Sequence, residues 1–98
     1  MDRLSTLELF VRVVERASFS AAAADLGISR PVATAAIKDL ERRLGTRLLQ
    51  RTTRHVQPTA EGEAYYRRCV SILADLEDAD RNAGGVVGGL LRVDVPGN

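Results

Sequence analysis

The stretch from Ser18 to Leu44 constrains the fold more than any other part of this chain. It divides into two short helical patterns joined at Gly27, a residue suited to the left-handed backbone that ends a helix. Ser20 is expected to cap the first helix and Ser29 the second, since each can accept a bond from a free N–H of the following turn. The stretch therefore predicts a helix-turn-helix over about residues 19–38.

The second helix of this pair has two faces. One carries aliphatic residues at steps of three and four, as expected for a stripe turned into a core: Ala33, Ile37, Leu40 and Leu44. The other is polar and cationic, with Arg30, Thr34, Lys38 and Arg42 at steps of four. Small neighbours let a helix approach base edges, while Arg and Lys reach guanines or phosphates. This face favours DNA recognition, and a solvated helix surface is the alternative for the stretch taken alone.

The charge of the chain is unevenly distributed. Between Ile28 and Gln57 seven cations face two anions, whereas from Pro58 to the end four cations face seven anions. A soluble domain without a charged partner would tend to intersperse its signs. The concentration of basic charge on one segment therefore indicates a polyanionic partner.

Size and composition limit the other classes. A chain of 98 residues with 45% hydrophobic content forms one small domain, and its low aromatic content predicts an aliphatic core. No apolar run approaches the roughly 20 residues of a membrane span, and the start lacks a signal-peptide pattern. The single cysteine, Cys69, excludes an internal disulfide and a cysteine zinc site. We expect a cytoplasmic protein without a metal or membrane partner.

A first helix is expected from about Leu4 to Arg16. Ser5 to Glu8 match a capping box, with Asp2 as an alternative start. The helix carries two apolar stripes, one of Leu7, Phe10, Val11 and Val14 and another of Leu9 and Val13. Two stripes indicate a second packing partner, either the last helix of the chain or another subunit.

After the helix-turn-helix, Thr46–Arg51 and His55–Gln57 read as two strands of a hairpin, stopped by Pro58. With Arg51 and Arg54 near its tip, such a hairpin is a wing that can reach a DNA backbone or a minor groove. The alternative is that these arginines are only solvated. Residues 1–58 would then form one winged domain.

Residues 59–83 predict a long helix with a broad apolar stripe that includes Tyr66, Cys69, Leu73 and Leu76. A helix of about 37 Å, at 1.5 Å per residue, is too long for so small a domain to cover. We expect it to pair with its copy in a dimer, and covering a further domain is the alternative. Residues 84–98 read as a Gly-rich hinge and the start of a following domain.

Enzyme chemistry is disfavoured. The chain has one histidine, His55, and no Gly-rich phosphate loop. Cys69 lies on the apolar stripe, so a buried thiol is favoured over a redox sensor. The remaining alternative to DNA binding is a protein-interaction module built on the long apolar helix and the acidic C-terminal half.

The chain resembles the N-terminal region of the LysR-type transcriptional regulators from about Leu4 to Val93. The resemblance rests on an ordered set of residues: Leu7, Phe10, Ser18-Phe19-Ser20, Ala22-Ala23, Leu26-Gly27, Ser29, Pro31, Ile37, Leu40-Glu41, Leu44-Gly45, Leu48, Arg51, Arg54, Thr59, Gly62 and Gly89-Leu90-Leu91-Arg92-Val93. It implies a mainly α fold, in which three helices and a β-hairpin wing form a winged helix-turn-helix, followed by a long dimerisation linker helix.

The resemblance also implies function. It implies a homodimer (or, at full length, a tetramer) that reads an interrupted inverted repeat in double-stranded promoter DNA, and a small-molecule effector for a following domain but no cofactor in this segment. Carried over by position, the DNA contacts would be Ser29, Arg30, Pro31, Thr34, Ala35, Lys38, Arg51, Thr53 and Arg54. Arg30 stands where the family often has Gln, and Ala35 where it often has Arg, so the family's base preferences cannot be transferred.

Overall fold

Asp2, and not Ser5, begins the first helix, α1 (Arg3–Arg16). The Asp2 carboxylate accepts a hydrogen bond of 2.8 Å from the backbone N–H of Ser5, and the Thr6 hydroxyl donates to the Asp2 carbonyl at 2.8 Å. The predicted capping box from Ser5 to Glu8 is therefore wrong, because Asp2 already supplies the acceptor one turn earlier. The structure is a computed structural model that describes residues 1–51 and 55–86.

The helix-turn-helix is formed by α2 (Phe19–Leu26) and α3 (Arg30–Leu44). Ser18 has the extended backbone of a cap, and its hydroxyl accepts from the N–H of Ala21 at 3.1 Å, so the predicted cap at Ser20 is wrong. Starting the helix earlier places Phe19 in the first turn, where its ring is buried. The caps at Gly27 and Ser29 are confirmed: Gly27 has φ 72°, and Ser29 accepts from the N–H of Val32 at 3.3 Å.

A two-stranded antiparallel hairpin follows, with β1 (Leu49–Arg51) paired to β2 (Val56–Pro58). Both strands begin later than predicted, and β2 extends to Pro58 rather than stopping before it. Pro58 is tolerated because strands at an edge need not donate from every N–H. The predicted turn at 52–54 lies outside the described residues.

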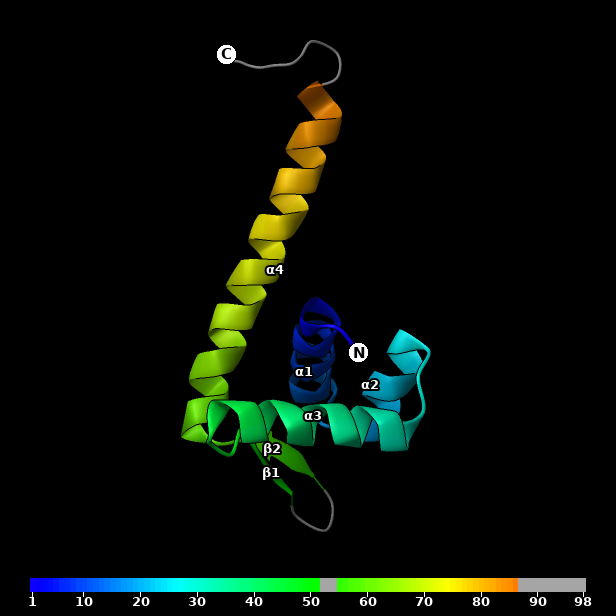
Figure 1. Ribbon diagram of the computed structural model, residues 1–98, viewed down its shortest axis with the longest axis vertical. Helices are drawn as coiled ribbons and strands as arrows, with labels where there is room; N and C mark the ends of the chain where they lie inside the picture. Colours follow the sequence, from blue (N-terminus) through cyan, green and yellow to red (C-terminus); the bar gives the residue numbers. More distant parts are fainter. Residues whose placement is uncertain (52–54, 87–98) are drawn as a thin grey trace.

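The last helix, α4 (Ala60–Val86), begins beside the hairpin and extends well beyond the rest of the molecule (Figure 1). Thr59 caps it by accepting a hydrogen bond of 2.9 Å from the N–H of Gly62. The helix ends three residues later than the predicted Ala83, so the first three residues of the predicted hinge are helical. The remainder of that hinge and the predicted strand after it lie outside the described residues.

The core surrounds α1, which packs against each of the other three helices. Both predicted stripes of α1 contribute to it, since Leu9 and Val13 are as fully buried as Phe10. The second stripe therefore finds its partner within the chain. Phe10 meets Tyr65 of α4 edge-to-face, with 5.6 Å between ring centres. Leu44 was expected in the core but is 42% exposed, because it is the last residue of α3 and lies past the edge of the packed layer.

Candidate nucleic-acid interface

The outer face of α3 presents the side chains that the sequence singles out. Ser29, Arg30, Pro31, Ala35 and Lys38 are exposed, and Thr34 is half-buried. On the opposite face, Ala33, Ile37 and Leu40 fill the core. The helix is thus anchored along one side and free along the other. Pro31 and Ala35 have small side chains, so little projects from the exposed face near the N-terminus of the helix. A groove of DNA can therefore approach the helix backbone there.

The hairpin lies at the same end of the molecule as α3, while α4 leads away from that end (Figure 1). Between α3 and the hairpin is an open cleft of about 430 Å³. Its lining includes four cationic side chains and one carboxylate: Lys38, Arg42, Arg47, Arg51 and Glu41. This excess of positive charge attracts phosphate groups, because the fields of several cations that line one concave surface add together there.

The cations of this cleft are held in different ways. The guanidinium carbon of Arg51 lies 4.6 Å from the centre of the Phe19 ring, which joins the end of β1 to the first turn of α2. Arg42 forms an exposed ion pair of 2.6 Å with Asp39. Arg47 donates to the carbonyl of Leu49 at 3.4 Å, yet its side chain remains 74% exposed. Exposed pairs of this kind are weak, so phosphate can compete for these arginines.

The structure brings together most of the predicted DNA contacts. Arg30, Pro31, Thr34, Ala35 and Lys38 share α3, Ser29 caps this helix, and Arg51 lies across the cleft from Lys38. Thr53 and Arg54 fall outside the described residues. Arg42 and Arg47 also line the cleft; Arg42 was predicted to lie on the cationic face of α3, but neither residue was among the contacts carried over from the family. The concentration of basic charge between Ile28 and Gln57 was the signal that could have identified them.

A second groove lies between α4 and the pair α1 and α2, with a volume of about 580 Å³. Its apolar lining consists of Val11, Leu26, Val70, Leu73, Ala74 and Leu76, and Glu8, Glu15, Asp25, Glu77, Asp80 and Arg12 surround it. Leu73 and Leu76 are thus two of the predicted dimerisation residues that reach this surface. The sequence did not place Val11 and Leu26 at this groove, because only tertiary packing brings α1 and α2 beside α4.

The other two predicted dimerisation residues lie elsewhere. Tyr66 is half-buried and its hydroxyl donates to Glu15 at 2.9 Å; this bond raises the pKa of the phenol, with burial and the carboxylate charge adding to it. Cys69 is fully buried in the core of its own chain, so it is not available to a second copy, and that part of the prediction is wrong. Burial raises the pKa of the Cys69 thiol to about 11, partly offset by a bond to Tyr65.

Within residues 1–51 and 55–86, no three His, Cys, Asp or Glu side chains gather closely enough to hold a metal ion. Among the helices of this described part, none is sufficiently long and apolar to cross a membrane.

The family model of the bacterial regulatory helix-turn-helix proteins of the lysR family matches residues 4–63. The chain belongs to this family. The match covers the whole winged unit, from α1 through the first turn of α4. The predicted resemblance and the winged helix-turn-helix fold are therefore confirmed.

Individual relatives agree with membership of the lysR family. An HTH-type transcriptional regulator of Haemophilus influenzae is 48% identical over 80 residues, which cover 82% of this chain and 28% of the relative. The HTH-type transcriptional regulator YhjC of Escherichia coli is 39% identical over 99 residues, covering 98% of this chain and 33% of the relative. Both relatives are named as transcriptional regulators, in agreement with the prediction that enzyme chemistry is disfavoured for this chain. The chain spans about a third of their length or less.

Solved structures of the lysR type share the fold. The BenM DNA-binding domain in complex with the catB site 1 DNA superposes with a TM-score of 0.85 at 34% identity, covering 93% of this chain and all of that one. Full-length CbnR in complex with its target DNA gives a TM-score of 0.78 at 29% identity, covering 87% of this chain and 30% of that one. The likeness to BenM extends over the described helices and hairpin together.

Proposed function

We propose that this chain binds double-stranded promoter DNA as a homodimer and is the DNA-reading part of a transcriptional regulator. The observation that carries the proposal is the shared placement of the exposed face of α3 and the cationic cleft beside the hairpin at one end of the molecule. The solved complexes of BenM and CbnR with DNA, which have the same fold, support it.

In this proposal the N-terminal half of α3 lies in the major groove. Arg30 is exposed in the first turn and can donate two parallel bonds to a guanine edge. Pro31 and Ala35 allow the close approach and offer apolar contact to a thymine methyl group, while Thr34 and the Ser29 region approach bases or adjacent phosphates. Lys38, further along the helix and lining the cleft, contacts the backbone.

The wing contacts the flanking DNA in the same proposal. Arg51 occupies the far end of β1, and its charge faces the cleft that Lys38 lines from the other side. The sequence places Thr53 and Arg54 in the turn that follows. A cation at such a tip suits a narrow minor groove, where the negative potential is strongest.

Dimerisation is proposed to use the groove between α4 and the α1–α2 pair. Leu76 and Val70 are each 39% exposed beside it, and covering the apolar surface that remains exposed contributes about 0.6–1.2 kcal/mol for each side chain. A twofold arrangement lets the same groove serve both copies. Two α3 helices then meet two half-sites, which accounts for an interrupted inverted repeat. At full length, the tetramer and the small-molecule effector domain remain part of the proposal.

The test is a titration of labelled duplexes followed by fluorescence anisotropy. The wild-type chain is first used to select a site from a random duplex library. The selected duplex and a shuffled duplex of the same composition are then titrated at two salt concentrations. Preference for the selected duplex together with a steep loss of affinity in higher salt is the expected result. Absence of binding to both duplexes at low salt contradicts the proposal and favours a protein-interaction module.

A further inference from the structure

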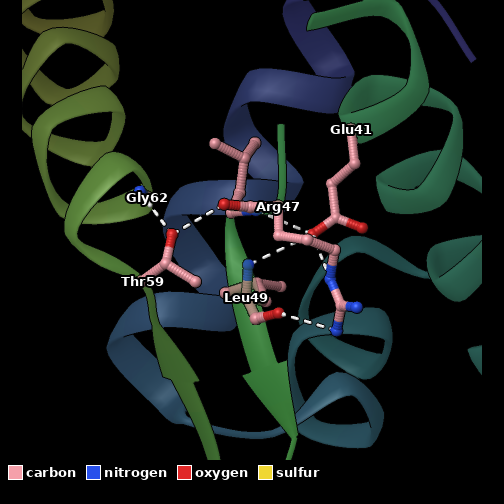
Figure 2. Close-up of polar contacts among 6 residues, drawn as sticks. Glu41, Arg47, Leu49, Thr59 and Gly62 are labelled. Atoms are coloured by element: carbon pink, nitrogen blue, oxygen red, sulfur yellow. Dashed lines mark hydrogen bonds and ion pairs between the residues drawn. The ribbon is translucent and has the colours of Figure 1, made fainter. Parts of the chain in front are cut away.

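Glu41 connects α3 to the wing through the backbone. Its carboxylate oxygen Oε2 accepts hydrogen bonds from the N–H groups of Leu48, at 2.8 Å, and Leu49, at 3.1 Å (Figure 2). These two donors lie where the chain enters β1, and the Glu41 side chain is only 15% exposed. One carboxylate from the last turns of α3 therefore fixes the start of the wing.

The bonds to the backbone, and not the neighbouring cation, give Glu41 this role. Arg47 Nε lies 4.0 Å from the same oxygen and the arginine is 74% exposed, so that ion pair is weak. Bonds from N–H groups to a charged acceptor are roughly twice as strong as neutral ones, and they have a direction. Without Glu41, two N–H groups in a partly buried position would lose their acceptor.

The same short segment is fixed from the other side by the start of α4. The Thr59 hydroxyl donates to the carbonyl of Arg47 at 2.7 Å (Figure 2). The Thr59 N–H donates to the carbonyl of Leu48 at 2.9 Å. Gly62 lies directly against that carbonyl. Residues 47–49 are thus held between α3 and α4, with Glu41 as the only side chain of α3 shown bonding to their backbone among the described residues.

We infer that Glu41 is a positioning residue for DNA binding: it fixes the angle at which the wing leaves α3. Arg51 is two residues beyond Leu49, and a strand advances about 3.3 Å per residue, so a change of direction at Leu49 displaces the Arg51 guanidinium. Glu41 thereby keeps Arg51 and Lys38 on opposite sides of one cleft. The inference rests on the proposed DNA-binding function.

Charge and position make opposite predictions for Glu41. Glu41 is an anion in a cleft that is proposed to face phosphate, so electrostatics alone predicts that removing its charge strengthens binding. Positioning predicts that the reach of the side chain matters more than its charge, because a Gln at this position still presents an acceptor oxygen to the two N–H groups. Glu41→Asp keeps the charge but shortens the side chain by one methylene, whereas Glu41→Gln keeps the length and an acceptor oxygen but loses the charge.

The experiment measures the affinity of the full 98-residue chain for the duplex that it selects from the random library. Asp39→Asn is the control for loss of an anion from α3, because Asp39 is exposed and pairs with Arg42 rather than with the wing. Glu41→Asp is expected to bind about fivefold more weakly than wild type, the scale of one lost hydrogen bond. The affinity of Glu41→Gln for the duplex is expected to lie within about twofold of the affinity of Asp39→Asn. Equal affinity of Glu41→Asp and wild type overturns the inference.

A double-mutant cycle separates positioning from general loss of structure. If Glu41 acts through the wing, Glu41→Asp has little further effect once Arg51→Ala has removed the cation that it positions. Equal losses in both backgrounds overturn the inference. Thermal unfolding of each variant sets a titration temperature at which all are folded. Failure of the wild-type chain to bind any duplex overturns the proposed function itself, a result distinct from unequal behaviour of the variants.

Discussion

The guanidinium of Arg51 lies on the ring of Phe19, with 4.6 Å from its central carbon to the ring centre. This contact joins the end of the first wing strand to the first turn of α2. The ring itself is buried, so it offers a fixed face to the cation. The arrangement holds the cation near α3 while leaving its N–H groups able to donate to a phosphate.

Arg51→Ala is therefore expected to weaken binding to selected and shuffled duplexes by similar factors and to reduce the salt slope by about one. Loss of the ring contact should lower the free energy of unfolding by about 0.5–1 kcal/mol. Arg51→Lys is the control, since it keeps the charge but loses the planar stack. Titrations at several salt concentrations check the slope, and an unchanged slope for Arg51→Ala removes this residue from the phosphate contacts.

Arg30→Ala is expected to cost about 1–3 kcal/mol on the selected duplex and to relax specificity, because a bidentate contact to guanine is lost. The matched control is Arg43→Ala, which removes the same charge from another exposed position of α3, outside the proposed contact face. Competition between selected and shuffled duplexes measures the change in specificity. Equal losses on both duplexes would contradict a base-reading role for Arg30.

Gly62→Ala is expected to destabilise the chain, although glycine to alanine in a helix usually stabilises by up to about 1 kcal/mol. A Cβ at position 62 would lie 1.9 Å from the backbone oxygen of Leu48, so the start of α4 would have to separate from the wing. We expect a loss of about 1–3 kcal/mol, as in other overpacked sites. Chemical denaturation provides the measurement. A variant more stable than wild type would show that this contact is not as close as described.

Leu76→Asp is expected to disrupt the proposed dimer while leaving the monomer folded, because Leu76 is 39% exposed and lines the groove beside α4. Ile72→Asp places the same charge on the same helix at a side chain that is 45% exposed and does not line the groove. Sedimentation analysis reports the assembly, and circular dichroism reports the fold. A dimer that persists in Leu76→Asp but dissociates in Ile72→Asp would move the interface to the other side of α4.

Cys69 is expected to resist thiol reagents in the folded chain at pH 8, because it is buried and its pKa is raised to about 11. A raised pKa in the folded state means that the neutral thiol is favoured there. Its stabilising contribution is complete below the ordinary pKa and is lost as the pH rises toward 11. Tyr65, whose pKa is also raised mainly by burial, changes stability in the same direction. Labelling kinetics with and without denaturant provide the check, and rapid labelling of the native chain would contradict the burial.

Local interactions are what the sequence predicted well. Gly27 and Ser29 act within three or four residues of their positions, so their capping roles can be predicted from the order of the residues. The division of α3 into an apolar and a polar face follows equally from its period. The predicted cap at Ser20 was wrong, because Ser18 caps the helix two residues earlier and places Phe19 in a buried first turn.

By itself, the sequence determined the helix-turn-helix, the cationic outer face of α3, the presence of a wing and the long last helix, because periodicity, caps and charge are local properties. Only the tertiary structure decided that Cys69 is buried within its own chain rather than against a second copy, that Val11 and Leu26 complete the groove beside α4, and that Glu41 holds the start of the wing. These depend on which segments meet in space. A stripe gives the direction of a side chain around its own helix, but the identity of its neighbour follows from packing among elements far apart in the chain.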